Sequence, residues 1–184
     1  MIRLFCSVVL FASPPVAMAQ VIIPRAPDIA ATSYVLLDAQ TGQILVEENA
    51  DEPLPPASLT KIMTAYIAIE EIINGNLELT DQVHISEKAW RMEGSKMFVD
   101  VNSQVSVEDL LRGIIIQSGN DASVAISEHI AGSEEAFADM MNQYSEVLGM
   151  KDSFFMNASG LDTELYYNTM SARDLSILAT ATIQ

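Results

Sequence analysis

Two adjacent prolines at positions 55 and 56 constrain the fold of this chain more than any other feature of its sequence. Proline breaks the interior of a helix because it has no backbone N–H, yet it is tolerated immediately before a helix begins. The residues that follow, ASLTKIMTAYIAIE, are apolar around nearly the whole circumference of a helix, which is typical of a central, buried helix. The sequence therefore predicts a buried helix that begins close to Ser58 and ends at the Asn-Gly-Asn run of residues 74–76.

The segment before the prolines has the pattern of a β-hairpin. Residues 33–38 and 43–48 are rich in strand-forming side chains, and the four residues between them include the glycine of a turn. A two-stranded hairpin alone is too small to form a stable sheet. We therefore expect further strands outside this sequence.

Downstream of residue 76 the pattern is mostly helical. Ser106 is expected to cap a helix with acids in its first turn, the favourable end for negative charge. Gly132 and Gly149 are expected to end two further helices. The predicted helices cover residues 86–91, 106–117, 122–131 and 133–148, with a last one that begins at 169 or 171 and simply stops at 184. The sequence thus predicts an incomplete α+β domain over residues 33–184, part of a longer protein.

The first nineteen residues have the features of a secretory signal peptide. Arg3 provides a positive start, residues 4–12 form an apolar core too short to span a bilayer, and residues 17–19 are a small-x-small cleavage site. Residues 20–32 then form a polar leader. Cleavage would remove Cys6, the only cysteine. An exported chain without cysteine fits the bacterial periplasm better than a disulfide-rich secreted scaffold.

Composition excludes several classes of function. The formal net charge of −16 and the pI near 4.2 argue against nucleic-acid binding and against electrostatic attachment to anionic lipid, because both need basic surface. His84 and His129 have no cysteine partner and no metal-ligand spacing, so neither a metal nor another cofactor is expected.

Ser58 and Lys61 form the first candidate site. Three residues apart on a helix, their side chains lie on one face, close enough for the amine to reach the hydroxyl. Burial and the positive helix end both disfavour an ammonium ion, so Lys61 can become a base for a serine nucleophile. The residues alone leave a second interpretation open, in which Ser58 only caps the helix and Lys61 extends into solvent.

Ser118-Gly119-Asn120 supplies a second element. The penicillin-binding protein signature begins with S-x-x-K followed by S-D-N, and the sequence matches both, with glycine in the middle position of the second. PLPPASLTKIMTAYIA, GSKMFV, LLRGIIIQSGNDASVAISEHIAGS, GLD and SARDLSIL, in this order, resemble the D-alanyl-D-alanine carboxypeptidases of the low-molecular-mass penicillin-binding protein family. The resemblance extends from about residue 31 to the end of the chain.

The resemblance implies a penicillin-recognising DD-peptidase fold and a serine peptidase that removes the terminal D-alanine from peptidoglycan stem peptides and is inhibited by β-lactams. It implies that Ser58 is the acylated nucleophile, Lys61 its base and Ser118 a proton relay, while Asn120 binds the substrate amide. Family members commonly carry a C-terminal membrane anchor, which would lie beyond Gln184. Lys96 and Phe98 fall in a segment that resembles the rim of the family's cleft.

The family's third element, K-[ST]-G, is absent after Asn120. We therefore expect the 184-residue chain alone to be inactive. Three alternatives stay open: a DD-endopeptidase of the same family, a non-catalytic cell-wall binding protein, and a β-lactamase. The last would use Glu164 and Asn168, which are spaced as in the E-x-x-L-N motif although Tyr167 replaces the leucine.

Overall fold

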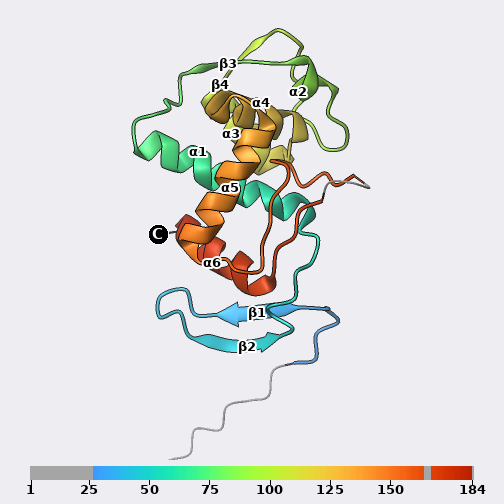
Figure 1. Cartoon of the computed structure of the whole chain (residues 1–184), viewed down its shortest axis with the longest axis vertical. Coiled ribbons are helices and arrows are strands. Elements are labelled where there is room, and N and C mark those ends of the chain that lie inside the picture. Colours follow the sequence, from blue (N-terminus) through green and yellow to red (C-terminus); the bar gives the residue numbers. More distant parts are fainter. Residues whose placement is uncertain (1–26, 164–166, 184) are drawn as a thin grey trace, which may run out of the picture.

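The computed structural model describes residues 27–163 and 167–183 (Figure 1). The helices and strands follow one another in this order: β1 (Tyr34–Leu37), β2 (Ile44–Glu48), a 3-10 helix η1 (Ala57–Leu59), α1 (Thr60–Ile73), β3 (Gln82–His84), α2 (Glu87–Arg91), β4 (Gln104–Ser106), α3 (Val107–Gln117), α4 (Asn120–Ala131), α5 (Glu134–Leu148) and α6 (Ala172–Ile183). The predicted mixture of helix and sheet is confirmed.

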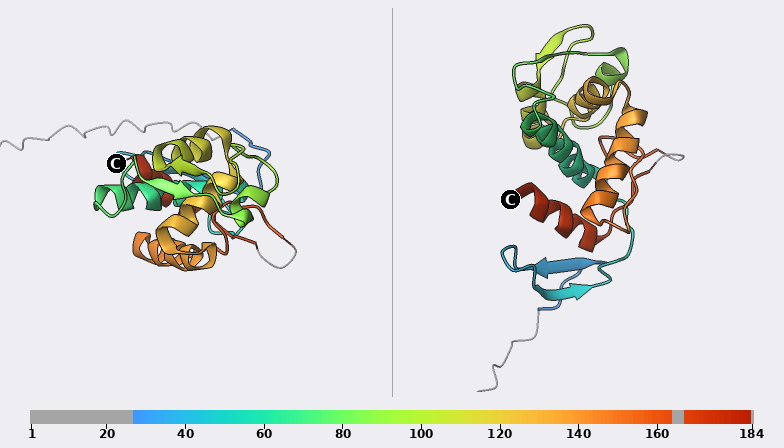
Figure 2. Two further views of the ribbon diagram at one scale, coloured as in Figure 1. Left: turned by 90° about the horizontal axis from the view of Figure 1, so that it is seen from above. Right: turned by 60° about the vertical axis from the view of Figure 1, so that its left-hand side comes forward.

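The predicted hairpin is present at one end of the molecule. β1 and β2 pair antiparallel, with Tyr34 opposite Glu48. Figure 1 and the right-hand view of Figure 2 place α6 between this hairpin and the other helices. Arg173 of α6 forms ion pairs with Glu47 at 2.8 Å and with Asp51. The hairpin is therefore fastened to the helical part by charged side chains as well as by packing.

Helix α1 lies between two hydrophobic cores, as its all-round apolar sequence predicts. One face contributes Ala65 and Ala68 to a core formed with α3, α4 and the β3–β4 ribbon. The opposite face contributes Met63 and Ile67, both fully buried, to a core formed with α5, α6 and the segment around Phe155. Burial of a side chain of this size contributes roughly 1.5–3 kcal/mol to folding. Packing on both sides fixes the position of α1, and with it the residues at its start.

The structure differs from the sequence prediction at two places. β3 and β4 form a two-stranded antiparallel ribbon that the sequence pattern did not predict, because strands of three residues are too short to show alternation. Helix α4 begins at Asn120, two residues earlier than expected. The predicted helix boundaries at Gly132 and Gly149 are confirmed.

Some predictions concern residues that the structure does not describe. The signal peptide of residues 1–19 and residues 20–26 of the leader lie outside the described residues, as does Glu164. Within residues 27–163 and 167–183, no helix combines the length and the apolar character needed to cross a membrane.

Candidate active site

Ser58 lies in η1, which continues directly into α1. Its side chain is exposed and caps neither helix, so the expected first-turn position is confirmed while the alternative capping role is wrong. The preceding residue, Ala57, has a φ of 46°, which is uncommon for a residue with a Cβ. Strain of this kind persists only where the surrounding structure imposes it. The nucleophile candidate therefore stands on a turn that its neighbours hold in place.

Lys61 is almost completely buried, with 4% of its surface exposed. Its Nζ contacts three oxygen atoms: Ser58 Oγ at 3.3 Å, Asn120 Oδ1 at 2.7 Å and the backbone carbonyl of Ser159 at 2.6 Å. No carboxylate is among these partners. The interpretation in which Lys61 extends into solvent is therefore wrong, because the amine is buried among these three oxygen atoms.

Burial lowers the pKa of Lys61 from its ordinary value of 10.5 to about 8. The neutral amine has two N–H donors and one lone pair. The carbonyl oxygens of Asn120 and Ser159 can only accept, so they use both N–H groups. The lone pair is then left for the hydroxyl of Ser58. The three contacts thus select the orientation in which Lys61 can take a proton from the serine.

Asn120 is the second predicted residue that the structure brings to Lys61. It is the first residue of α4, and its Nδ2 donates to the carbonyl of Glu93 at 2.7 Å while its Oδ1 accepts from Lys61. Ser118 is half-buried at the turn between α3 and α4, in the left-handed region at φ 55° and ψ 39°. Within the described residues, its hydroxyl makes no hydrogen bond to Ser58, Lys61 or Asn120.

Asp121, which follows Asn120, is fully buried and fixes the loop at the edge of the site. Its carboxylate accepts hydrogen bonds from three successive backbone N–H groups, those of Met97, Phe98 and Val99. Phe98 is left 80% exposed, and Lys96 donates to the carbonyl of Trp90 at 2.9 Å. The loop is therefore rigidly attached to α4, with an exposed aromatic ring at its tip.

This geometry can be compared with known proteins. The sequence profile of the D-alanyl-D-alanine carboxypeptidase family, Peptidase_S11, matches residues 20–184. The chain belongs to this family. The D-alanyl-D-alanine carboxypeptidase DacC of Escherichia coli is 42% identical over 183 residues, which cover 96% of this chain and 45% of that protein. The crystal structure of the carboxypeptidase DacD from Francisella tularensis superposes with a TM-score of 0.84 at 42% identity, over 91% of this chain and 40% of that one.

Two proteins of lower sequence identity bear on the alternative functions. The D-alanyl-D-alanine endopeptidase of Pseudomonas aeruginosa is 32% identical over 173 residues, 94% of this chain and 53% of that protein. Penicillin-Binding Protein D2 of Listeria monocytogenes, in its ampicillin-bound form, superposes with a TM-score of 0.76 at 28% identity, over 86% of this chain and 64% of that one. The DD-peptidase fold is confirmed, and the chain spans less than two thirds of each of these relatives.

Ser159 belongs to the site because its carbonyl binds Lys61, and the sequence pattern did not predict this. Its contribution is a backbone carbonyl, which no side-chain pattern reveals. The carbonyl is held in place by its neighbour Ala158, whose N–H donates to Glu134 at 3.1 Å and whose carbonyl accepts from Thr64 at 2.7 Å. The only sequence signal was the polar, loop-like composition of residues 157–162.

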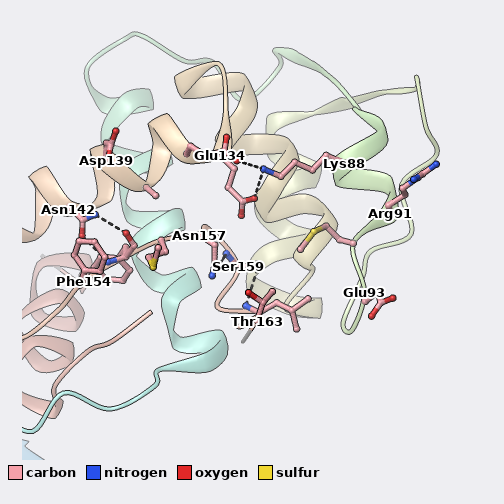
Figure 3. Close-up of a pocket in the computed structure, with 16 residues that line it drawn as sticks. Lys88, Arg91, Glu93, Glu134, Asp139, Asn142, Phe154, Asn157, Ser159 and Thr163 are labelled. Carbon is pink, nitrogen blue, oxygen red and sulfur yellow. Dashed lines mark hydrogen bonds and ion pairs between the residues drawn. The ribbon is translucent and has the colours of Figure 1, made fainter. Parts of the chain in front are cut away.

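A cavity of about 690 Å³ adjoins this cluster, between α2, α5 and residues 154–163 (Figure 3). Glu93 and Ser159 line it, and their backbone carbonyls bind Asn120 and Lys61. Lys88 and Glu134 form an ion pair at 3.0 Å on its wall. The cavity therefore borders the backbone segments that bind Asn120 and Lys61, while Ser58, Lys61 and Asn120 themselves do not line it.

Proposed function

We propose that the protein containing this chain is a serine-type D-alanyl-D-alanine carboxypeptidase, and that residues 33–184 are part of its catalytic domain. The observation that carries the proposal is the contact between Ser58 and a buried Lys61 whose other partners can only accept hydrogen bonds. Membership of the family and the ampicillin-bound relative support a peptidoglycan stem peptide as substrate and β-lactams as inhibitors.

In the proposed reaction, neutral Lys61 accepts the hydroxyl proton of Ser58 as the serine oxygen attacks the carbonyl carbon between the two D-alanines. The first N–H groups of a helix have no intrahelical partner, so the start of α1 can stabilise the oxyanion that forms. The C–N bond then breaks as the proton that Lys61 took from Ser58 passes through Ser118 to the leaving D-alanine amine, which leaves Lys61 neutral again. Water hydrolyses the ester on Ser58 and regenerates the enzyme.

Asn120 serves two purposes in this scheme. Its Oδ1 orients Lys61, a role that the 2.7 Å contact supports. Its Nδ2 has two hydrogens, of which one binds the carbonyl of Glu93, so the other remains for the substrate amide.

The decisive test compares wild-type protein with Ser58→Ala, in a chain extended to the length of its relatives. We expect wild type to form a stable adduct with fluorescent penicillin and to release D-alanine from a pentapeptide, and Ser58→Ala to do neither. Ser106→Ala is the matched control, because that serine only caps α3. Labelling of Ser58→Ala at the wild-type rate would overturn the assignment of the nucleophile.

A DD-endopeptidase is the second candidate, because the Pseudomonas aeruginosa relative carries that name. The same protein should be incubated with cross-linked peptide dimers and with uncross-linked pentapeptide. Preferential release of D-alanine from the pentapeptide supports the carboxypeptidase, and preferential cleavage of the dimers supports the endopeptidase. Absence of penicillin labelling in the extended wild-type protein would instead favour a non-catalytic cell-wall binding protein.

The 184-residue chain by itself is proposed to be inactive, because it lacks the K-[ST]-G element after Asn120. Hydrolysis of a D-alanyl-D-alanine peptide by the purified chain at the rate of the extended protein would contradict this.

We also propose export to the periplasm through residues 1–19, with attachment to the inner membrane if the extended protein has a C-terminal anchor. Terminal sequencing of the protein recovered from the periplasm should begin at Gln20. Recovery of an intact Met1 terminus in the cytoplasm would contradict the proposal.

A further inference from the structure

Asn168 is completely buried, and its amide uses its full hydrogen-bonding capacity. The Oδ1 atom accepts from the backbone N–H groups of Met156 at 2.7 Å and Asn157 at 3.2 Å. The Nδ2 atom donates to Thr60 Oγ1 at 3.0 Å and to the carbonyl of Asn157 at 3.1 Å. One side chain therefore joins the first residue of α1 to the segment that leads into Ser159.

The backbone around Asn168 is held on both sides. Thr169 and Phe154 exchange two backbone hydrogen bonds of 2.9 Å. Met170 likewise pairs with Leu54, the residue before the two prolines, at 2.9 and 3.2 Å. These backbone hydrogen bonds place Asn168 beside Thr60. They also fix the segment at Leu54 that leads into the turn at Ser58.

The segment bound by Asn168 packs directly against the turn that contains Ala57 and Ser58. A Cβ on Gly160 would lie 1.8 Å from the carbonyl oxygen of Ala57 and 2.8 Å from Thr60 Oγ1, and Gly160 itself has a φ of 72°. Both facts require glycine at this position. The close contact explains how Ala57 keeps its positive φ of 46°, because the backbone of one segment blocks relaxation of the other.

This arrangement differs from the β-lactamase interpretation of the same residue. In that interpretation Asn168 belongs to an E-x-x-L-N motif whose glutamate acts through a water that deacylates the enzyme. Here all four of its hydrogen-bonding positions are taken by protein atoms. Asn168 therefore has no hydrogen-bonding capacity left for a water molecule or a substrate group.

We propose that Asn168 is a positioning residue, which acts through Thr60 and residues 156–160 to hold the Ser58 turn and the Ser159 carbonyl around Lys61. The proposal rests on the proposed roles of Ser58 and Lys61. Without the Asn168 amide, the segment separates from Thr60 and water reaches the Lys61 amine. The amine then regains solvation, and fewer molecules carry it in the neutral form at pH 7.

The first test measures the Lys61 amine directly and needs no enzymatic activity. The sequence has only four lysines, at positions 61, 88, 96 and 151, so a ¹³Cε-lysine NMR titration resolves each one. In Asn168→Ala we expect the pKa of Lys61 to rise by about one unit or more, a tenfold loss of neutral amine at pH 7. Asn142→Ala is the matched control, because that half-buried amide binds only Phe155 in the same segment.

A second pair of variants breaks the same link from its other end. Thr60→Val removes the hydroxyl while keeping the shape of the side chain, and Thr60→Ser keeps the hydroxyl. We expect Thr60→Val to raise the pKa of Lys61 as Asn168→Ala does, and Thr60→Ser to leave it unchanged. If Asn168→Ala does not fold, this pair decides the question.

The third measurement is the pH profile of penicillin acylation in the extended protein. For Asn168→Ala and Thr60→Val we expect a rate at pH 7 lower by about tenfold, recovered at higher pH because the neutral amine returns. A lower melting temperature with an unchanged pKa and pH profile would show that Asn168 only stabilises the fold, and would overturn the proposal. If wild type fails to acylate, the proposed function fails, while the NMR titration still judges the role of Asn168.

Discussion

The start of α1 differs from the starts of three other helices in the same chain. Ser86, Ser106 and Ser133 each accept a hydrogen bond from the backbone N–H three residues later and so cap α2, α3 and α5. Ser58 stands at a similar place, but its hydroxyl caps nothing and contacts Lys61 instead. The same residue type thus caps three helices and contacts a buried lysine at the fourth, where we propose that it is the nucleophile.

Charge shows the same contrast. The first turns of α2, α3 and α5 contain acids, which suit the positive end of a helix. The first turn of α1 contains no acid and holds Lys61. The position is unfavourable for an ammonium ion, and that is useful, because the proposed reaction needs the neutral amine. Proteins tend to break local rules of helix stability at functional sites, and this contrast fits the proposed role of Lys61. Four predictions test this difference, from the largest expected effect to the smallest.

The largest effect is expected from Lys61→Gln in the extended protein. Glutamine keeps an N–H donor group but is not a base, so penicillin acylation should slow by about 10²–10⁴-fold. Stopped-flow or gel-based labelling measures the rate. Lys151→Gln, at an exposed position, is the control and should acylate normally. Equal rates for the two variants would remove Lys61 from the mechanism.

The second prediction concerns stability and pH. The pKa of Lys61 is about 8 in the folded chain against 10.5 ordinarily, so between these values the unfolded state binds more protons and wild-type stability rises with pH. The rise should approach roughly 3 kcal/mol and be absent from Lys61→Gln. Below pH 8 both states of wild type are protonated, so the difference between the two proteins should be constant. Urea unfolding at a series of pH values measures the free energy of unfolding of both proteins. Plots of this free energy against pH that stay parallel up to pH 10.5 would contradict the prediction.

The third prediction separates the two kinds of serine. Ser106→Ala and Ser133→Ala should each lower the free energy of unfolding by about 1 kcal/mol, because each removes a cap. Ser58→Ala should change it by less than about 0.5 kcal/mol, because no cap is lost. Chemical denaturation of the three variants gives the comparison. A loss at Ser58 equal to that at Ser106 would mean that Ser58 also stabilises its helix.

The smallest effect is expected at the acid in the first turn of α3. Glu108 lies near the helix start and pairs with Arg112 at 2.6 Å on an exposed face. Glu108→Gln should cost about 0.5 kcal/mol at low salt and less at high salt, because screening weakens both interactions. An effect that does not change with salt would show that charge is not its cause.

Much of the fold could be predicted because its signals are local. The hairpin, the buried α1 and the helix ends at Gly132 and Gly149 follow from periodicity, turn residues and caps over a few positions. The β3–β4 ribbon escaped prediction because its strands have three residues each and are stabilised by pairing with one another. The first turn of α4 escaped because Asn120 and Asp121 resemble loop residues, and only their burial in the structure explains their helical position.

The sequence by itself determined which groups stand near each other within one helix. The spacing of three residues between Ser58 and Lys61 places the amine beside the hydroxyl, and the apolar residues that follow ensure that the helix is buried. Tertiary structure decided what else surrounds the amine. Asn120 and the Ser159 carbonyl come from 59 and 98 residues further along the chain. Their convergence on Lys61 depends on packing between distant segments, and only that packing removes the water that would keep the amine charged.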